Sequence, residues 1–169
     1  DAYYEDLNRG EESMFKIDSS VFIDSLKYET IGGRTVYGGG GISPDVFVPY
    51  DTTGSTFYLS SLEWSGVFNQ FVFDWCKNSK QFIQSSWQSF EEYDQGFESL
   101  NLLPKLIEYA EKEFKIKPFN KSEIESSASR ILRRLKSEIA RQFWNEDGFY
   151  KVYNRFDQDV KSGIQSFAE

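Results

Sequence analysis

The stretch of sequence that decides the fold is residues 120–143, NKSEIESSASRILRRLKSEIARQF. Apolar side chains recur along it every three or four residues, which places them on one face of an α-helix. These side chains are Ile124, Ala128, Ile131, Leu135, Ile139 and Phe143. Either Asn120 with Glu123 or Ser122 with Glu125 is suited to cap the start of the helix. An apolar face of this length has to be covered, so the sequence predicts a helical domain built around it.

Further helices are predicted on both sides of this long one from apolar spacing and capping residues. They cover residues 56–64, 67–77, 89–95 and 103–114 before it and residues 157–167 after it. Gly66 separates the first two, and Pro118 follows the fourth. Ser89 and Glu92 have the spacing of a capping box at the start of the third.

The sequence before residue 51 lacks the helical spacing of apolar residues seen in the later part of the chain. Within residues 27–49, short β-rich pieces alternate with glycine, including a Gly32-Gly33 break and a run from Gly38 to Gly41. The Gly32-Gly33 pair suits a two-residue turn, because glycine adopts positive φ without a Cβ clash. We therefore expect a hairpin, followed by a third strand at residues 46–48.

Together these patterns predict an α+β fold that is mainly α: a small glycine-rich β-hairpin element followed by a helical domain. The predicted parts are an acidic lead-in over residues 1–26, a β-rich segment over residues 27–50, and the helical domain over residues 51–169.

Composition excludes several classes of site. The 169 residues contain no His, which removes imidazole bases, Ser/His/Asp triads and His-ligated metals. The one cysteine, Cys76, has no second thiol in the chain and is interpreted as a packing residue. A formal net charge of −8 opposes binding to the phosphates of nucleic acids. No apolar run approaches the roughly 18 residues that a membrane-spanning helix needs, and neither a cofactor nor a metal site is predicted.

Three motifs invite a chemical interpretation, and a structural one is favoured for each. Ser13 and Lys16 have the Ser-x-x-Lys spacing of penicillin-recognising enzymes, but the companion Ser-Asp-Asn and Lys-Thr-Gly elements are missing. The Gly38–Gly41 run resembles a phosphate cradle, but no Gly-Lys-Ser/Thr follows it. Residues 157–159 begin like a calcium loop, but Ser162 stands where such a loop needs glycine, so a capped helix start is favoured.

Basic and aromatic residues are concentrated in the helical part. A basic group in the second half of the long helix is interpreted as a solvated face, in which Arg134 pairs with Glu138 at i, i+4, and a polyanion site is the less favoured alternative. This group consists of Arg130, Arg133, Arg134, Lys136 and Arg141. Aromatic residues make up 18% of the chain, more than a small core needs. Packing is the default interpretation of these rings, whereas exposed ones would suit binding of a protein or a glycan.

Residues 30–49, TIGGRTVYGGGGISPDVFVP, contain two short motifs, Thr-x-x-Gly-Arg and Gly-Ile-x-Pro-Asp followed by an apolar strand. The matching positions are Thr30, Gly33, Arg34, Gly41, Ile42, Pro44, Asp45 and Val46. The combination resembles the carboxy-terminal processing, or tail-specific, peptidases. Residues 3–11 look like an insertion of some bacterial members, and the later helices are similar in pattern to their carboxy-terminal extension.

This resemblance implies proteolysis by a Ser/Lys dyad, in which burial lowers the pKa of the lysine so that it acts as a base. It also implies a PDZ module that delivers the free C-terminus of the substrate. In the family the nucleophilic Ser and the Lys precede the Gly-Arg segment, so no residue here is assigned a catalytic role, and the matched motif residues are assigned a structural one. Expected partners are protein or peptide substrates, bound through PDZ and catalytic domains outside this chain. The expected location is the periplasm or cell envelope of a bacterium.

The main hypothesis is therefore that the chain is the C-terminal, non-catalytic portion of a bacterial tail-specific serine peptidase, inactive by itself. Its helical domain would pack on the peptidase core and brace it, shape substrate access or mediate assembly. The alternative is a free-standing helical module that binds a protein or glycan through exposed aromatic rings. The sequence leaves open the physiological substrate and whether the chain forms a homo-oligomer.

Overall fold

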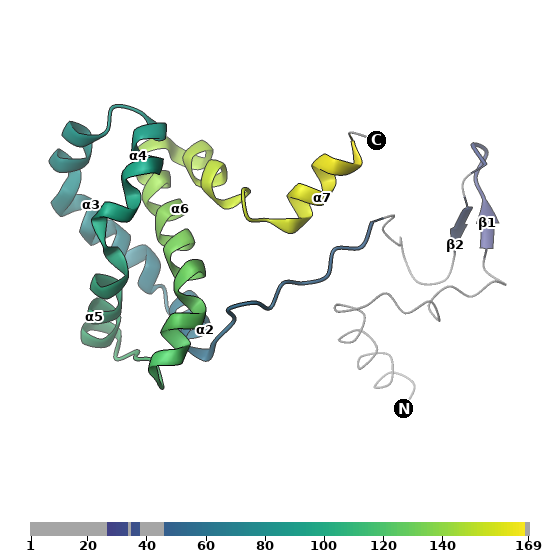
Figure 1. Ribbon diagram of the computed structural model, residues 1–169. Helices are drawn as coiled ribbons and strands as arrows, with labels where there is room; N and C mark the ends of the chain where they lie inside the picture. Colours follow the sequence, from purple (N-terminus) through teal and green to yellow (C-terminus); the bar gives the residue numbers. More distant parts are fainter. Residues whose placement is uncertain (1–26, 34, 38–45, 168–169) are drawn as a thin grey trace. The chain divides into compact units, whose positions relative to one another are not determined.

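The long amphipathic helix predicted over residues 120–143 lies within the helical bundle in Figure 1, which shows the computed structural model of the chain. The structure describes residues 27–33, 35–37 and 46–167. Their contacts form two units, one with the hairpin and one spanning Thr52–Ile164. The described residues contain six α-helices, one 3-10 helix and a two-stranded antiparallel hairpin. The predicted fold class, α+β and mainly α, is confirmed.

The hairpin pairs β1 (Lys27–Glu29) with β2 (Thr35–Tyr37), and Tyr28 lies opposite Val36. The connection begins with a turn in which the Gly33 N–H donates to the Thr30 carbonyl oxygen at 2.9 Å. Gly33 has φ of 78°, which is the left-handed conformation that favours glycine. The predicted two-residue turn at Gly32-Gly33 is wrong, because the connection runs from Thr30 to the start of β2.

The third strand predicted at residues 46–48 is also wrong, since these residues lie outside any strand. The segment is followed by Pro49, whose nitrogen has no hydrogen to donate to a sheet ladder.

The helices begin where capping side chains satisfy their first N–H groups. Thr56 accepts from the Leu59 N–H, Ser89 from the Glu92 N–H and Asn120 from the Glu123 N–H. Of the two caps considered for the long helix, Asn120 is the one observed. The helices are α2 (Phe57–Trp64), α3 (Val67–Ser86), α4 (Phe90–Gly96), the 3-10 helix η3 (Phe97–Leu100), α5 (Leu102–Phe114), α6 (Lys121–Tyr153) and α7 (Gln158–Ser166).

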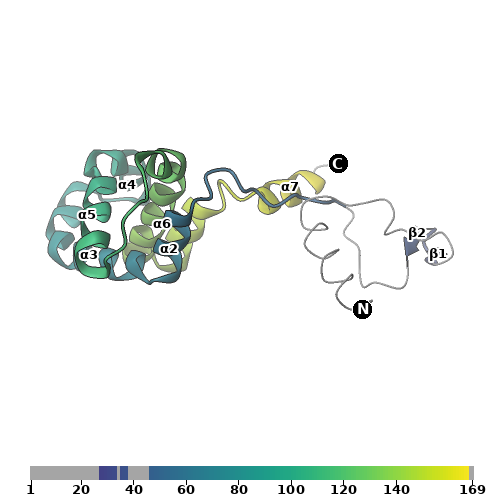
Figure 2. The same cartoon turned by 90° about the horizontal axis from the view of Figure 1, so that it is seen from below.

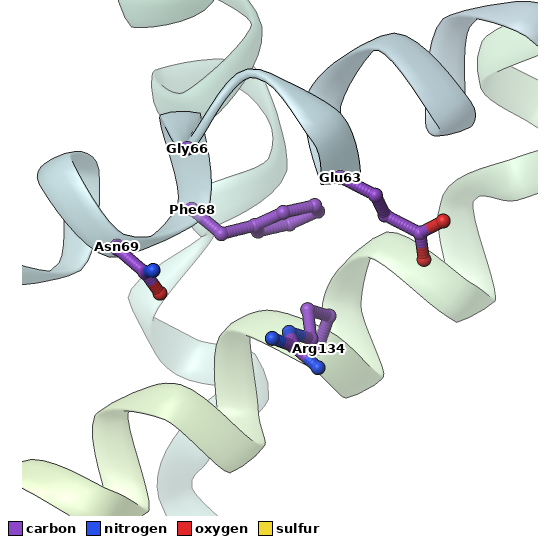
Figure 3. A pocket seen from close by; sticks show the side chains of 5 residues that line it. All are labelled: Glu63, Gly66, Phe68, Asn69 and Arg134. Atoms are coloured by element: carbon purple, nitrogen blue, oxygen red, sulfur yellow. The ribbon is translucent and has the colours of Figure 1, made fainter.

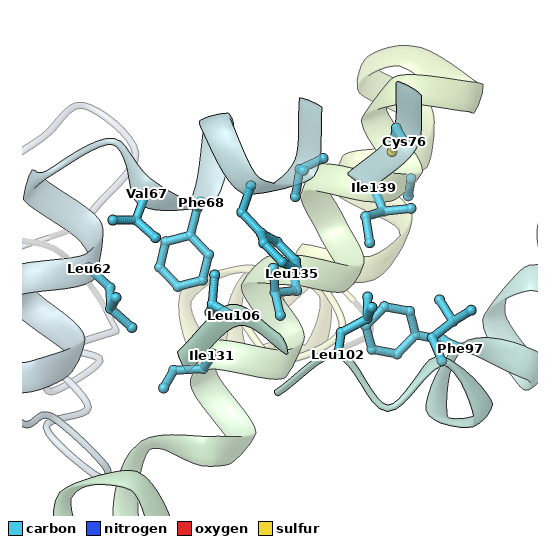
Figure 4. Close-up of a cluster of buried hydrophobic side chains, with 14 of the residues drawn as sticks. Leu62, Val67, Phe68, Cys76, Phe97, Leu102, Leu106, Ile131, Leu135 and Ile139 are labelled. Carbon is cyan, nitrogen blue, oxygen red and sulfur yellow. The ribbon is translucent and has the colours of Figure 1, made fainter. Parts of the chain in front are cut away.

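The core forms where α6 packs against α2, α3, α4 and α5 (Figures 1 and 2). Ile131, Leu135 and Ile139 are completely buried on the predicted apolar face. Figure 4 shows them facing apolar side chains of the other helices, among them Leu62 and Leu106. Burying one such side chain stabilises the fold by about 1.5–3 kcal/mol, so this face accounts for much of the stability of the bundle.

α6 changes direction at Trp144 and Asn145, a kink that the periodicity does not predict. Asn145 has φ of 54° and ψ of −152°, so the chain leaves the helical path and resumes it afterwards. Gly148, just after the kink, lies against the part of α6 that holds Ala140 and Trp144. A Cβ atom on Gly148 would stand 2.7 Å from the Ala140 carbonyl oxygen and 2.7 Å from Trp144 Cβ. Glycine is therefore required for the close approach of the two parts of α6.

We predict that Gly148→Ala lowers the free energy of unfolding by about 1–3 kcal/mol, because the added methyl group overpacks this contact. Chemical denaturation followed by circular dichroism measures the change. Gly163→Ala is the matched control, since Gly163 is also helical and a Cβ there would have no neighbour within 4 Å. The control should be neutral or stabilising by up to about 1 kcal/mol, and equal losses in both variants would contradict the prediction.

Candidate functional site

The residues of the two family motifs are only partly described. Thr30 and Gly33 lie in the hairpin turn, where they are joined by the backbone hydrogen bond given above. The other matched positions of the site prediction lie outside the described residues: Arg34, Gly41, Ile42, Pro44 and Asp45. The Ser13/Lys16 pair and the Gly38–Gly41 run also lie outside them.

The basic group of α6 is half-exposed and not fully solvated as predicted, because two of its arginines pair with a buried carboxylate. Glu138 is 3% exposed. Its Oε1 lies 2.8 Å from Arg134 Nη2 and its Oε2 lies 2.9 Å from Arg141 Nη1. The Arg134–Glu138 pair is thus confirmed. The Phe149 ring packs against the guanidinium group of Arg141, with the ring centroid 3.8 Å from the guanidinium carbon. The arginines turn inward because a buried carboxylate needs charged partners.

A second ionic cluster, partly buried, joins α4 to α6 and the chain after it. Asp94 Oδ1 lies 2.9 Å from Lys136 Nζ, and Asp94 Oδ2 lies 2.7 Å from Arg155 Nη1. Partial burial acts to raise the pKa of Asp94, but the hydrogen bonds from Lys136 and Arg155 outweigh it and hold the pKa below its ordinary value. Next to it, the Tyr93 hydroxyl donates to the Lys136 carbonyl oxygen at 2.7 Å, and burial raises the Tyr93 pKa well above its usual range.

Aromatic rings gather beside this cluster. The Trp144 ring centroid lies 5.2 Å from that of Tyr93 and 5.8 Å from that of Phe90. Trp87 packs edge-on against Tyr93 with centroids 5.3 Å apart. These rings fill the core, whereas other aromatic side chains, among them Phe57, Trp64 and Phe119, are exposed.

A small hollow lies at the corner between α2 and α3 (Figure 3). It has a volume of about 130 Å³ and is lined by Glu63, Gly66, Phe68, Asn69 and Arg134. The charge of Arg134 is already balanced by Glu138, and Glu63 adds a carboxylate to the wall. The hollow therefore carries no excess positive charge with which to hold an anion.

A second hollow of about 190 Å³ lies between η3, α5 and α6 and has a mainly apolar lining. It is lined by Phe97, Glu98, Asn101, Leu102, Leu103, Pro104 and Leu132. Both hollows are smaller than the roughly 300–1,000 Å³ of typical sites for organic ligands.

The remaining candidate side chains take structural positions. Cys76 is buried in the core, and burial raises the pKa of its thiol to about 12, so the nucleophilic thiolate is not formed at neutral pH. Asp157 Oδ1 accepts the N–H groups of Asp159 and Val160 at the start of α7, as in the favoured capped helix. Among the described residues, no three Cys, Asp or Glu side chains come together in a group that could hold a metal ion.

Comparison with known proteins places the bundle in a family. Residues 58–145 match a family of unknown function, DUF8443, and these residues run from α2 to the kink of α6. The chain belongs to this family. No curated protein and no solved structure matches the chain. Within the described part of the chain, no helix combines the length and apolar character that crossing a membrane requires.

Sequence reasoning missed the depth of both ionic clusters. The spacing of Arg134 and Glu138 gives their pairing, but Asp94 and Arg155 are 61 residues apart and no local pattern joins them. The apolar spacing that predicts a helix over residues 56–64 also gives no sign that Phe57 is exposed.

We predict that Asp94→Asn lowers the free energy of unfolding at pH 7 by about 1–2 kcal/mol, since it weakens two charge-assisted hydrogen bonds. The pKa of Asp94 is lower in the folded chain than in the unfolded one, so its contribution is present above about pH 4 and is lost as pH falls through the folded pKa. Urea denaturation between pH 7 and pH 3 should show the variant and the unmodified chain converging at the acid end. Asp147→Asn, at an exposed carboxylate of α6, is the control; a gap that is constant with pH would contradict the prediction.

For the other cluster, we predict that Glu138→Gln destabilises the chain by about 3 kcal/mol, because two arginines lose their shared buried counter-charge. The melting temperature and urea midpoint measure the loss. Glu146→Gln removes the exposed carboxylate on the same Arg141 and should cost less than about 1 kcal/mol. Similar losses in the two variants would show that burial of Glu138 contributes nothing.

Proposed function

We propose that this chain is the C-terminal, non-catalytic portion of a bacterial tail-specific serine peptidase. The observation that carries the proposal is the succession of Thr-x-x-Gly-Arg and Gly-Ile-x-Pro-Asp within residues 30–45. In the whole enzyme a Ser/Lys dyad would cleave proteins near their C-termini, in the periplasm or cell envelope. Substrates would be bound by a PDZ module and a catalytic domain, and the present residues would support them.

The hairpin geometry supports a structural role for the first motif. Its Thr30 and Gly33 close the turn through backbone atoms, and Gly33 uses a conformation that other residues adopt only with strain. Each strand has three residues, and β1 is exposed throughout. A two-stranded hairpin of this size is not stable alone, which fits a hairpin that completes the sheet of a larger catalytic core.

The character of the helical unit supports a bracing role in the proposed enzyme. Its buried carboxylate, Glu138, is paired with Arg134 and Arg141. Its buried thiol is protonated at neutral pH, and the two hollows described above are small. None of these groups presents a reactive atom, so the unit is suited to packing on the core and to shaping access to it.

The proposal is tested by assaying cleavage of a protein with an unstructured C-terminal tail. The product of the complete gene should cleave it, and substitution of the Ser of its dyad should abolish turnover. The 169-residue chain should show no turnover above the buffer blank. Comparable cleavage by the 169-residue chain, or a complete product without a Ser/Lys dyad, would refute the proposal.

A further inference from the structure

Helix α2 has one face in the core and another in solvent. Tyr58, Leu59 and Leu62 are buried, whereas Phe57 is 82% exposed and Trp64 is 91% exposed. Two aromatic rings this exposed on one short helix leave apolar surface in contact with water, and such surface commonly marks an interaction site.

The exposed face has a symmetric pattern, which we call the α2 stripe: Phe57, Ser60, Ser61 and Trp64. Positions i, i+3, i+4 and i+7 share one side of a helix, and this spacing is the same in both directions along the chain. If a second α2 lies antiparallel on the first, each Phe57 meets the Trp64 of the other copy, and the Ser60 and Ser61 residues of both copies meet around the two-fold axis. A two-fold interface requires this kind of self-complementarity.

The centre of the stripe can be covered at little cost. Its serines are small, so two helix axes can approach closely while the rings overlap at both ends. The Ser61 hydroxyl donates to the Phe57 carbonyl oxygen at 2.8 Å, so covering it leaves no unpaired donor. The one charged residue of α2, Glu63, is not part of the stripe.

A third exposed ring lies near the Phe57 end. The Glu123 carboxylate accepts the Tyr58 N–H through Oε1 at 3.2 Å and the Phe119 N–H through Oε2 at 2.7 Å. The start of α2 and Phe119, which is 92% exposed, are therefore held close together. With this ring, two copies would bury roughly 1,000 Å² in total, the area of a weak but specific interface.

We propose that the α2 stripe is a homodimer interface, in which α2 of one copy packs antiparallel on α2 of a second copy. A second copy is favoured over an unrelated partner because it supplies an aromatic ring opposite Phe57 and opposite Trp64 at once, and because the rings of two copies reach the area that a weak dimer needs. The inference is independent of the proposed peptidase origin.

Sedimentation velocity on the 169-residue chain tests the dimer over micromolar to millimolar concentrations. We expect a monomer–dimer equilibrium with a dissociation constant in the micromolar range. Trp64→Glu should weaken it at least about tenfold, because the dimer would bury two unpaired carboxylates. Phe167→Glu, which removes another highly exposed ring, is the matched control and should leave the equilibrium unchanged. A chain that is monomeric throughout, or a Trp64→Glu variant that dimerises normally, would overturn the proposal.

Oxidative cross-linking tests the geometry. The antiparallel arrangement places residue 60 next to the two-fold axis, so Ser60→Cys should form an intermolecular disulfide rapidly. Lys80→Cys, at an exposed site on α3, should not. The native Cys76 is buried and does not compete. Equal rates for the two variants would exclude pairing through the stripe.

Discussion

Burial of Ile131, Leu135 and Ile139 on α6 is the constraint on which the rest of the bundle depends. These side chains are completely excluded from solvent, and α2, α3, α4 and α5 all contact the helix that carries them. A single amphipathic helix cannot cover its own apolar face. The shorter helices therefore fold in the positions that remove this face from water, and their own apolar side chains complete the core in Figure 4.

The polar side of α6 is fixed by the same packing. Once the bundle closes, Glu138 and Lys136 lie at its edge with little access to water. Each then needs an opposite charge, because an unpaired buried ion is far more costly than a paired one. Arg134 and Arg141 come from α6 itself, whereas Asp94 comes from α4 and Arg155 from beyond α6. The Asp94 cluster thus links α4 to α6 and to the segment after it, whereas the Glu138 cluster lies within α6.

The parts of the fold that follow from local chemistry could be predicted from the sequence. The caps at Thr56, Ser89 and Asn120 and the stripe of α6 depend on residues only three or four positions apart. The kink at Asn145 could not, since it depends on the contact of Gly148 with Ala140 across the bend. The exposure of Phe57 illustrates a different limit. Two residues along a helix change direction by about 200°, so Phe57 and the buried Leu59 face opposite ways although both are apolar.

The candidate site shows the same division between local and long-range information. The spacing of Arg134 and Glu138 predicts their pairing. It does not predict that the side chains of the basic group are partly buried, because that depends on Phe149, which follows the bend and lies over Arg141. The hairpin turn uses Thr30 and Gly33 in a way that glycine patterns indicate only approximately. The predicted length of this turn is wrong because the register of β1 and β2 is set by cross-strand pairing and not by the glycines alone.

The single thiol of the chain, Cys76, can report local opening of the bundle. Cys76 is enclosed by the helices packed around α3, and a disulfide reagent can react with it only after that enclosure opens. The rate of thiol exchange would therefore report how often α3 separates from its neighbours. No label has to be introduced, and the absence of a second cysteine makes every modification event assignable to this one position.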